Sequence, residues 1–161
     1  MASGKTTVGR ILSRTLKADF IDTDDEIVKM EGRSIPQIFE ASGEPYFRDL
    51  ETKVLRKLME NSSGQRIVSV GGGLPVREEN RRLMKEIGRA VYLTADVPTL
   101  KRRLDGGNGR PMLADADLEK KIRTLMDQRK DLYLDAADVC IATDKLSPRG
   151  VAKAIIDWME A

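Results

Sequence analysis

The sequence predicts an α/β protein, a three-layer sandwich in which helices cover both faces of a central parallel sheet. Short apolar runs typical of buried strands occur at residues 18–22, 66–70, 90–93 and 139–142. Segments with apolar side chains at helical spacing separate these runs, and strands that alternate with helices pair in parallel. The length of 161 residues, 40% of them apolar, predicts one domain over residues 1–161.

The helices are predicted from apolar spacing and from signals at their ends. Val8, Ile11 and Leu12 recur on one face of the first helix. Ser34 and Gln37 have the spacing of a capping box, which indicates that a helix begins there. The predicted helices cover residues 5–17, 24–31, 34–41, 44–60, 77–87, 96–104, 118–133 and 147–160.

The composition excludes several classes of function. The net charge is only +2 with both signs dispersed, so we expect no nucleic-acid partner. Histidine is absent, which excludes histidine triads and leaves a carboxylate, lysine, tyrosine or the lone cysteine as general base. That cysteine, Cys140, lies in an apolar run and is expected to be a buried thiol. No run is long and apolar enough to span a membrane and no signal peptide is present, so we expect a cytoplasmic location.

The first residues match the second half of a phosphate-binding loop, G-x-x-x-x-G-K-[ST]. They read Ser3-Gly4-Lys5-Thr6-Thr7, directly before the first predicted helix. Backbone N–H groups of such a loop surround phosphate oxygens, the lysine adds a positive charge, and the hydroxyl after it can bind Mg²⁺. A helix N-terminus beneath the loop also favours an anion. The alternative is an N-terminus without function before a surface helix.

The first half of this motif does not occur in the sequence. The first glycine of the pattern would lie five residues before Gly4, ahead of the first residue. The apolar strand that normally feeds such a loop is absent too. We therefore expect the native chain to begin further upstream, and the sheet of this chain to lack its first strand.

Two acidic residues follow the first predicted strand. Asp22 and Asp24 are two positions apart, so their side chains can point the same way. Beside a triphosphate, one carboxylate could hold Mg²⁺ and the other could accept the proton of an attacking hydroxyl. The alternative is that they cap the next helix. The phosphate loop favours the catalytic interpretation.

Glycines and arginines mark further candidate sites. Gly71, Gly72 and Gly73 follow a compact apolar strand, which indicates that some group approaches the backbone closely there. The glycine-rich, charged segment 105–117 is predicted to be a mobile loop, and its Arg110 is suited to a developing phosphoryl charge. Arg48 and Arg129 lie on predicted helices, and the sequence alone predicts that both face solvent.

Taken together, these motifs resemble those of the shikimate kinases, in the nucleoside-monophosphate-kinase-like group of P-loop folds. The matching stretches run in family order across essentially the whole chain. They are residues 3–10 (SGKTTVGR), 20–27 (FIDTDDEI), 34–39 (SIPQIF), 43–51 (GEPYFRDLE), 71–73 (GGG), 110–113 (RPML) and 129–133 (RKDLY).

The resemblance implies a P-loop kinase fold and transfer of the γ-phosphoryl group of ATP to the 3-hydroxyl of shikimate, with Mg²⁺ as cofactor and a monomeric protein. It implies a substrate-binding helical segment at 34–61 and a lid at 105–117. The residues it assigns to ATP are Ser3, Gly4, Lys5, Thr6, Thr7, Arg103 and Arg110, with Thr6 and Asp22 at the metal. Those it assigns to shikimate are Asp24 as the base, Arg48 and Arg129 on the carboxylate, and Gly71, Gly72 and Gly73 lining the pocket; Lys5, Asp24 and Arg110 are its catalytic residues.

One residue departs from the family pattern, and two other functions stay open. Asp131 stands where the family usually has proline, and its charge either weakens the Arg129 contact or faces solvent. A kinase for gluconate or a nucleoside monophosphate would have the same fold. A truncated paralogue that binds nucleotide without catalysis would explain the incomplete loop.

Overall fold

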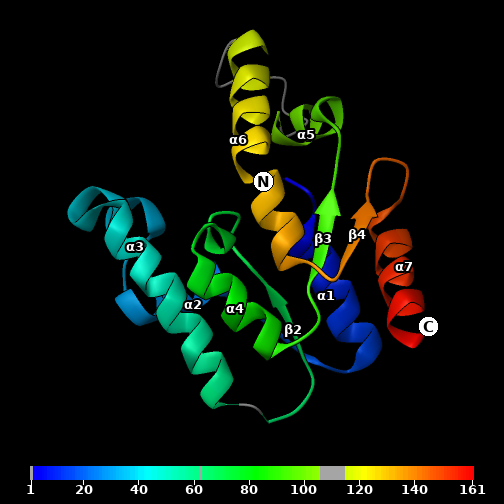
Figure 1. The fold of residues 1–161 in the computed structure, drawn as a ribbon, viewed down its shortest axis with the longest axis horizontal. Helices are drawn as coiled ribbons and strands as arrows, with labels where there is room; N and C mark the ends of the chain where they lie inside the picture. The colour runs from blue at the N-terminus through cyan, green and yellow to red at the C-terminus, as the bar shows by residue number, and fades with distance from the viewer. Residues whose placement is uncertain (1, 62, 106–114) are drawn as a thin grey trace.

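The computed structural model describes residues 2–61, 63–105 and 115–161, and helices alternate with strands along the chain (Figure 1). Every strand and helix expected from the sequence is present in this part of the chain. The elements are α1 (Lys5–Leu16), β1 (Asp19–Asp22), α2 (Thr23–Glu31), α3 (Ile35–Glu60), β2 (Arg66–Ser69), α4 (Glu78–Ile87), β3 (Val91–Thr94), α5 (Val97–Leu104), α6 (Asp115–Ala136), β4 (Val139–Ala142) and α7 (Pro148–Glu160).

Apart from shifts of one to three residues at element ends, three features differ from the sequence-based expectation. A short 3-10 helix, η1 (Leu74–Val76), follows the three glycines. Helix α6 already begins at Asp115, so the predicted loop 105–117 is helical at its C-terminal end, and its residues 106–114 lie outside the described part. The two helices expected on either side of residue 43 form one element, α3, with a non-helical break at Gly43 (φ 78°, ψ 173°).

The strands form two parallel pairs. Strand β1 pairs with β2 in the register Asp19 to Arg66, and β3 pairs with β4 in the register Val91 to Val139. Among the residues that the structure describes, β2 and β3 are not paired with each other. The sheet is thus parallel as expected but divided, and the idea that a first strand is missing from it stays a prediction.

Helices cover both faces of the strands, as alternation along β2 shows. Ile67 packs against the cluster that holds Val8 and Leu12 of α1 with residues of α7. The next residue, Val68, packs against the opposite cluster, formed by α2, α3 and η1. Because successive strand residues point to opposite faces, this arrangement requires three layers.

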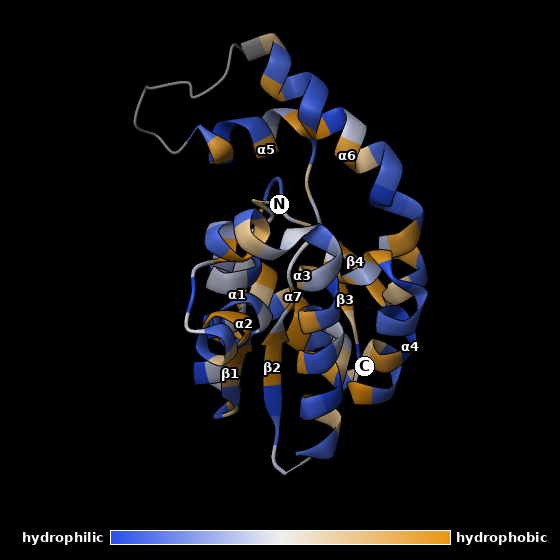
Figure 2. Ribbon diagram, turned by 90° about the vertical axis from the view of Figure 1, so that its left-hand side faces the viewer, coloured by the Kyte–Doolittle hydropathy of each residue, from blue (hydrophilic) through white to orange (hydrophobic). Residues whose placement is uncertain are grey.

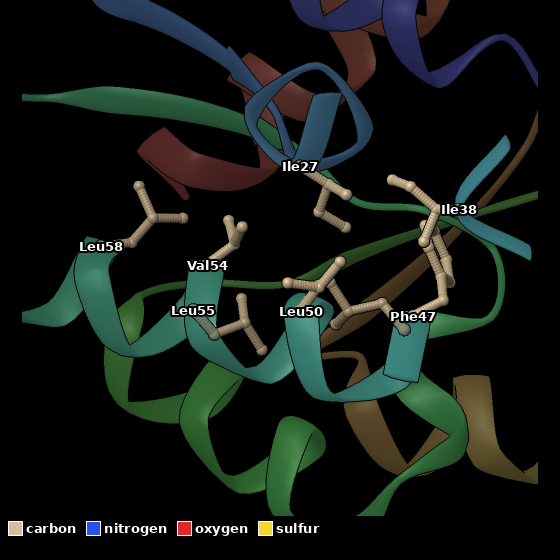
Figure 3. Close-up of a cluster of buried hydrophobic side chains, with 8 residues drawn as sticks. Ile27, Ile38, Phe47, Leu50, Val54, Leu55 and Leu58 are labelled. Atoms are coloured by element: carbon tan, nitrogen blue, oxygen red, sulfur yellow. The ribbon is translucent and has the colours of Figure 1, made fainter. Parts of the chain in front are cut away.

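The larger core lies between α2 and α3. Leu50 and Val54 of α3 point toward Ile27 of α2 (Figure 3), and the buried members are Ile27, Ile38, Phe47, Leu50, Val54, Leu55, Leu58 and Leu74. Leu55 is 1% exposed, so truncating it to alanine should cost about 2–5 kcal/mol of unfolding free energy. This packing fixes the position of α3, which carries Arg48.

The carboxyl ends of the strands meet beneath α5 and α6 (Figure 2). Capping side chains start the helices there: Asp22 accepts from the Asp24 amide, and Asp96 accepts from the Thr99 amide. The Ser34 and Gln37 capping box is confirmed. Within the described ranges, no helix is long and apolar enough to cross a membrane. The expectation of a buried Cys140 is wrong, because it is exposed on β4.

Candidate active site at the carboxyl ends of the strands

The predicted phosphate-binding residues lie at the N-terminus of α1. Gly4 occupies the N-cap with φ 89° and ψ 15°, a left-handed conformation that favours glycine. No side chain caps this helix, so the N–H groups of its first turn point out of the helix without an intrahelical acceptor. Ser3 is buried, and Lys5 lines a pocket with it. This end of α1 can therefore receive an anion.

Thr6 and Asp22 bring two oxygen donors together. Thr6 Oγ1 donates to Asp22 Oδ2 at 3.2 Å, and this contact is exposed. The other carboxylate oxygen of Asp22 accepts from the Asp24 amide at 3.0 Å. Asp22 therefore caps α2 with one oxygen and faces Thr6 with the other. The capping interpretation is confirmed for Asp22, and its metal-binding role stays a prediction. Hydroxyl and carboxylate oxygens are ligands that suit Mg²⁺.

Asp24 is half-buried next to this pair. Its Oδ1 is buried and has no hydrogen-bond partner among the described residues. Burial raises the pKa of the Asp24 carboxyl, and the charge of Asp22 raises it further, while Lys5 and Arg48 act in the opposite direction. Asp24 thus lies within electrostatic reach of both the phosphate-loop lysine and the arginine of α3.

Arg48 is largely buried, so the expectation that it faces solvent is wrong. Its side chain is 14% exposed, and Nη1 donates to Glu51 Oε2 at 2.7 Å. Nη2 donates to Glu44 Oε1 at 2.9 Å. Glu51 is 1% exposed, and burial raises the pKa of its carboxyl against the opposing effect of Arg48. Sequence reasoning assigned no role to Glu51, although its i+3 spacing from Arg48 was a usable signal.

Two of the three glycines give room to these side chains. A Cβ atom on Gly71 would lie 2.7 Å from Asp24 Oδ1, and one on Gly73 would lie 2.1 Å from Arg48 Nη1. The predicted close approach to the backbone is therefore confirmed at both positions. The Gly71 amide also donates to Thr23 Oγ1 at 3.0 Å, which ties the end of β2 to the start of α2.

Arg129 reaches the same region from α6. It is partly exposed and lines a mostly apolar pocket together with Lys5, Gly71, Gly72 and Tyr133. Tyr133 Oη donates to the Gly72 carbonyl at 2.5 Å. Asp131, two residues after Arg129, is exposed, so its charge faces solvent. The pocket therefore combines the phosphate-loop lysine, the glycine segment and a second arginine.

Arg103 lies beside the loop that follows β4. Its guanidinium donates to Thr143 Oγ1 at 3.0 Å and to the Thr143 carbonyl at 3.2 Å. A third bond, of 3.3 Å, reaches the Ala2 carbonyl. Arg103 thus joins α5, the end of β4 and the start of the chain. Arg110, the predicted lid residue, lies outside the described residues.

One edge of the parallel strands carries a helix start that can receive phosphate, two aspartates at strand ends and two arginines. This combination defines a P-loop kinase. The Shikimate kinase family model matches residues 1–160, and the chain belongs to the shikimate kinase family. A curated shikimate kinase of Limosilactobacillus fermentum is 42% identical, and the match covers 99% of this chain and 91% of that protein.

Solved structures agree with this assignment. The shikimate kinase of Acinetobacter baumannii in complex with shikimate is 36% identical with a TM-score of 0.87, and the match covers 99% of this chain and 88% of that one. The shikimate kinase of Aquifex aeolicus is 38% identical with a TM-score of 0.77, over 99% of this chain and 91% of that one.

Proposed function

We propose that this chain transfers the γ-phosphoryl group of ATP to the 3-hydroxyl of shikimate. The family membership supports this reaction, and one feature of the site carries the argument. The half-buried Asp24 lies within electrostatic reach of both Lys5 and Arg48. A base close to both a phosphate-binding group and a carboxylate-binding group can act on an acceptor hydroxyl that meets the γ-phosphoryl group there.

The nucleotide is held by the start of α1. The amides of residues 3–7 and the Lys5 ammonium bind the phosphates, and the α1 dipole adds to their attraction. Arg103 and residues 144–148 flank the adenine, in keeping with the contacts of Arg103 to neighbouring Thr143.

Thr6 and Asp22 fit a divalent cation, which we propose to be Mg²⁺. Their oxygens are 3.2 Å apart and exposed, and they are hard donors of the kind that Mg²⁺ prefers. When bound with ATP, the ion would neutralise charge on the phosphates. No group of three acidic or cysteine side chains in the described ranges forms a metal cage, so phosphates and water would complete the coordination.

The acceptor is held by residues that come from three elements. Arg48 and Arg129 bind the shikimate carboxylate, for which a planar guanidinium is well suited. Asp24 accepts the hydroxyl proton as the new O–P bond forms, and the bond between the γ-phosphorus and the β–γ bridging oxygen breaks to release ADP. Gly71, Gly72 and Gly73 line the pocket without side chains that would fill it.

A coupled assay of ADP release tests the proposal. Purified protein is given ATP, Mg²⁺ and shikimate, and each component is omitted in turn. We expect ADP release only with all three, and phosphoshikimate as the second product. Gluconate and a nucleoside monophosphate serve as alternative acceptors, and turnover of either in preference to shikimate would contradict the assignment.

We also propose that the protein acts as a cytoplasmic monomer without a nucleic-acid or membrane partner. The net charge of +2 with both signs dispersed gives no basic surface for nucleic acid, and a single cysteine suits a reducing compartment. Light scattering coupled to gel filtration would test the monomeric state, with a mass near 18.0 kDa as the expected result.

A further inference from the structure

Residues Gly71 to Val76 form what we call the glycine segment. Every backbone carbonyl of this segment accepts a hydrogen bond. Two carbonyls are bonded within the segment, since Leu74 N donates to Gly71 O and Val76 N donates to Gly73 O. The other four accept from side chains of α4 and α6. The donors are Tyr133 Oη to Gly72 O, Asn80 Nδ2 to Leu74 O, and Arg81 Nη1 to both Pro75 O and Val76 O.

Asn80 connects this segment to α3. Its side chain is 0% exposed, and Nδ2 lies 2.9 Å from the Leu74 carbonyl. On its other side, Asn80 Oδ1 accepts from Thr52 Oγ1 at 2.7 Å. Thr52 lies one turn after Arg48 on the same helix. A buried amide with both ends bonded fixes the distance between the elements it joins.

Arg81 connects the same segment to α6. Its side chain is 12% exposed, and Nη1 lies 2.9 Å from Pro75 O and 3.0 Å from Val76 O. Nε donates to Asp135 Oδ2 at 2.6 Å. Asp135 and Tyr133, which holds the Gly72 carbonyl, both follow Arg129 along α6. Two separate bonds therefore tie the glycine segment to the helix of the second arginine.

We propose that Asn80, Arg81 and Tyr133 are positioning residues that fix the position of the Arg48 side chain relative to the Arg129 side chain. They hold the glycine segment as a rigid spacer between α3 and α6, and the Arg48 guanidinium rests against Gly73 of that spacer. None of the three needs to touch the acceptor. This inference rests on the proposed function, because the two arginines matter together only if they share one carboxylate.

Arg81→Met tests the proposal, with Arg82→Met as a matched control. Arg82 is the next residue on α4, is 74% exposed and pairs only with Glu78 in the described part. We expect Arg81→Met to raise the KM for shikimate about tenfold or more, because small displacements of binding groups have large kinetic effects. The KM for ATP should stay within about twofold, and Arg82→Met should change neither. Arg81→Lys should restore part of the loss.

Tyr133→Phe is a second variant that removes only a hydroxyl and keeps the ring against Tyr92. It should raise the KM for shikimate in the same way with little change in melting temperature. Equal changes in both KM values, or a lower melting temperature with unchanged KM values, would overturn the positioning role.

Amide hydrogen exchange separates this inference from the proposed function. In free Arg81→Met, the amides of Gly72, Gly73, Leu74 and Val76 should exchange faster than in the unaltered chain, with no change in Arg82→Met. Unchanged exchange would overturn the spacer whatever the kinetics show. If the unaltered chain transfers no phosphoryl group to shikimate, the proposed function fails. The rates of amide hydrogen exchange then decide by themselves whether the glycine segment is a rigid spacer.

Discussion

The guanidinium group of Arg48 lies directly against the backbone of Gly73, where a Cβ atom would be 2.1 Å from Nη1. The same guanidinium donates hydrogen bonds to Glu51 and Glu44. Gly73→Ala should therefore displace Arg48 and raise the KM for shikimate about tenfold or more, with little effect on the KM for ATP. Steady-state kinetics with each substrate varied in turn would measure this.

Gly88→Ala is the control for that substitution. Gly88 follows α4, has extended backbone (φ 166°), and has no atom within 4 Å of the position of an added Cβ. The Gly88→Ala substitution should leave the KM values for shikimate and ATP unchanged. A Gly73→Ala protein with a normal KM for shikimate would show that Arg48 does not bind the acceptor from its observed position.

Asp24→Asn should lower turnover on the order of a hundredfold or more, because it removes a base for which this chain has no histidine to substitute. ATP binding, measured by calorimetry without shikimate, should stay nearly intact. Asp25→Asn changes the neighbouring exposed carboxylate and should have little effect. Near-normal turnover by Asp24→Asn would remove Asp24 from the catalytic role.

Arg129→Ala should raise the KM for shikimate far more than the KM for ATP. Loss of one partner of a desolvated charge pair typically costs about 2–5 kcal/mol of binding free energy. Lys130→Ala alters the adjacent exposed residue of α6 and serves as control. The methyl ester of shikimate should bind the unaltered protein as weakly as shikimate binds the variant. A similar rise in both KM values would instead indicate a structural role for Arg129.

Asp135→Asn should destabilise the protein in a pH-dependent way. Hydrogen bonds from Arg81, and then from Lys85, hold the pKa of Asp135 below its ordinary value of 3.8. A lowered folded-state pKa stabilises the protein above 3.8 and loses that stabilisation as the pH falls through the folded value. The effect should be small, since the Asp135 side chain is 52% exposed.

Melting temperatures from neutral pH down to about pH 3 would measure this dependence. The difference between the unaltered chain and Asp135→Asn should be constant near neutrality and should shrink below about pH 4. Asp131→Asn, which changes an exposed residue of the same helix, serves as the control. A difference that grows in acid would contradict the assigned direction of the pKa shift.

Local features of this fold were predictable because the residues that cause them are neighbours in sequence. The capping box of Ser34 and Gln37 and the helix end at Gly32 depend only on a few adjacent residues. Alternation of strands and helices likewise predicted parallel pairing.

Tertiary features were not predictable from spacing alone. Arg48 looked like an ordinary helix-surface arginine, and only the packing of α3 shows that it is largely buried beside Glu51. Asn80 and Arg81 carried no signal at all, because the carbonyls they bind become neighbours only after η1 forms. The spacing of Asp22 and Asp24 predicted two adjacent carboxylates and allowed helix capping as an alternative, but it did not show that Asp22 caps α2 while Asp24 is half-buried.

The buried Oδ1 of Asp24, which has no hydrogen-bond partner in the part of the chain that the structure describes, should make the protein less stable than it could be. A carboxylate whose charged form is disfavoured by burial lowers the free energy of unfolding of the protein at neutral pH, and so destabilises it. Natural selection keeps such residues where activity needs them, and replacing them commonly stabilises a fold. The Asp24→Asn variant, although nearly inactive, should therefore melt at a higher temperature than the unaltered chain, so a screen for stability alone would select against catalysis at this position.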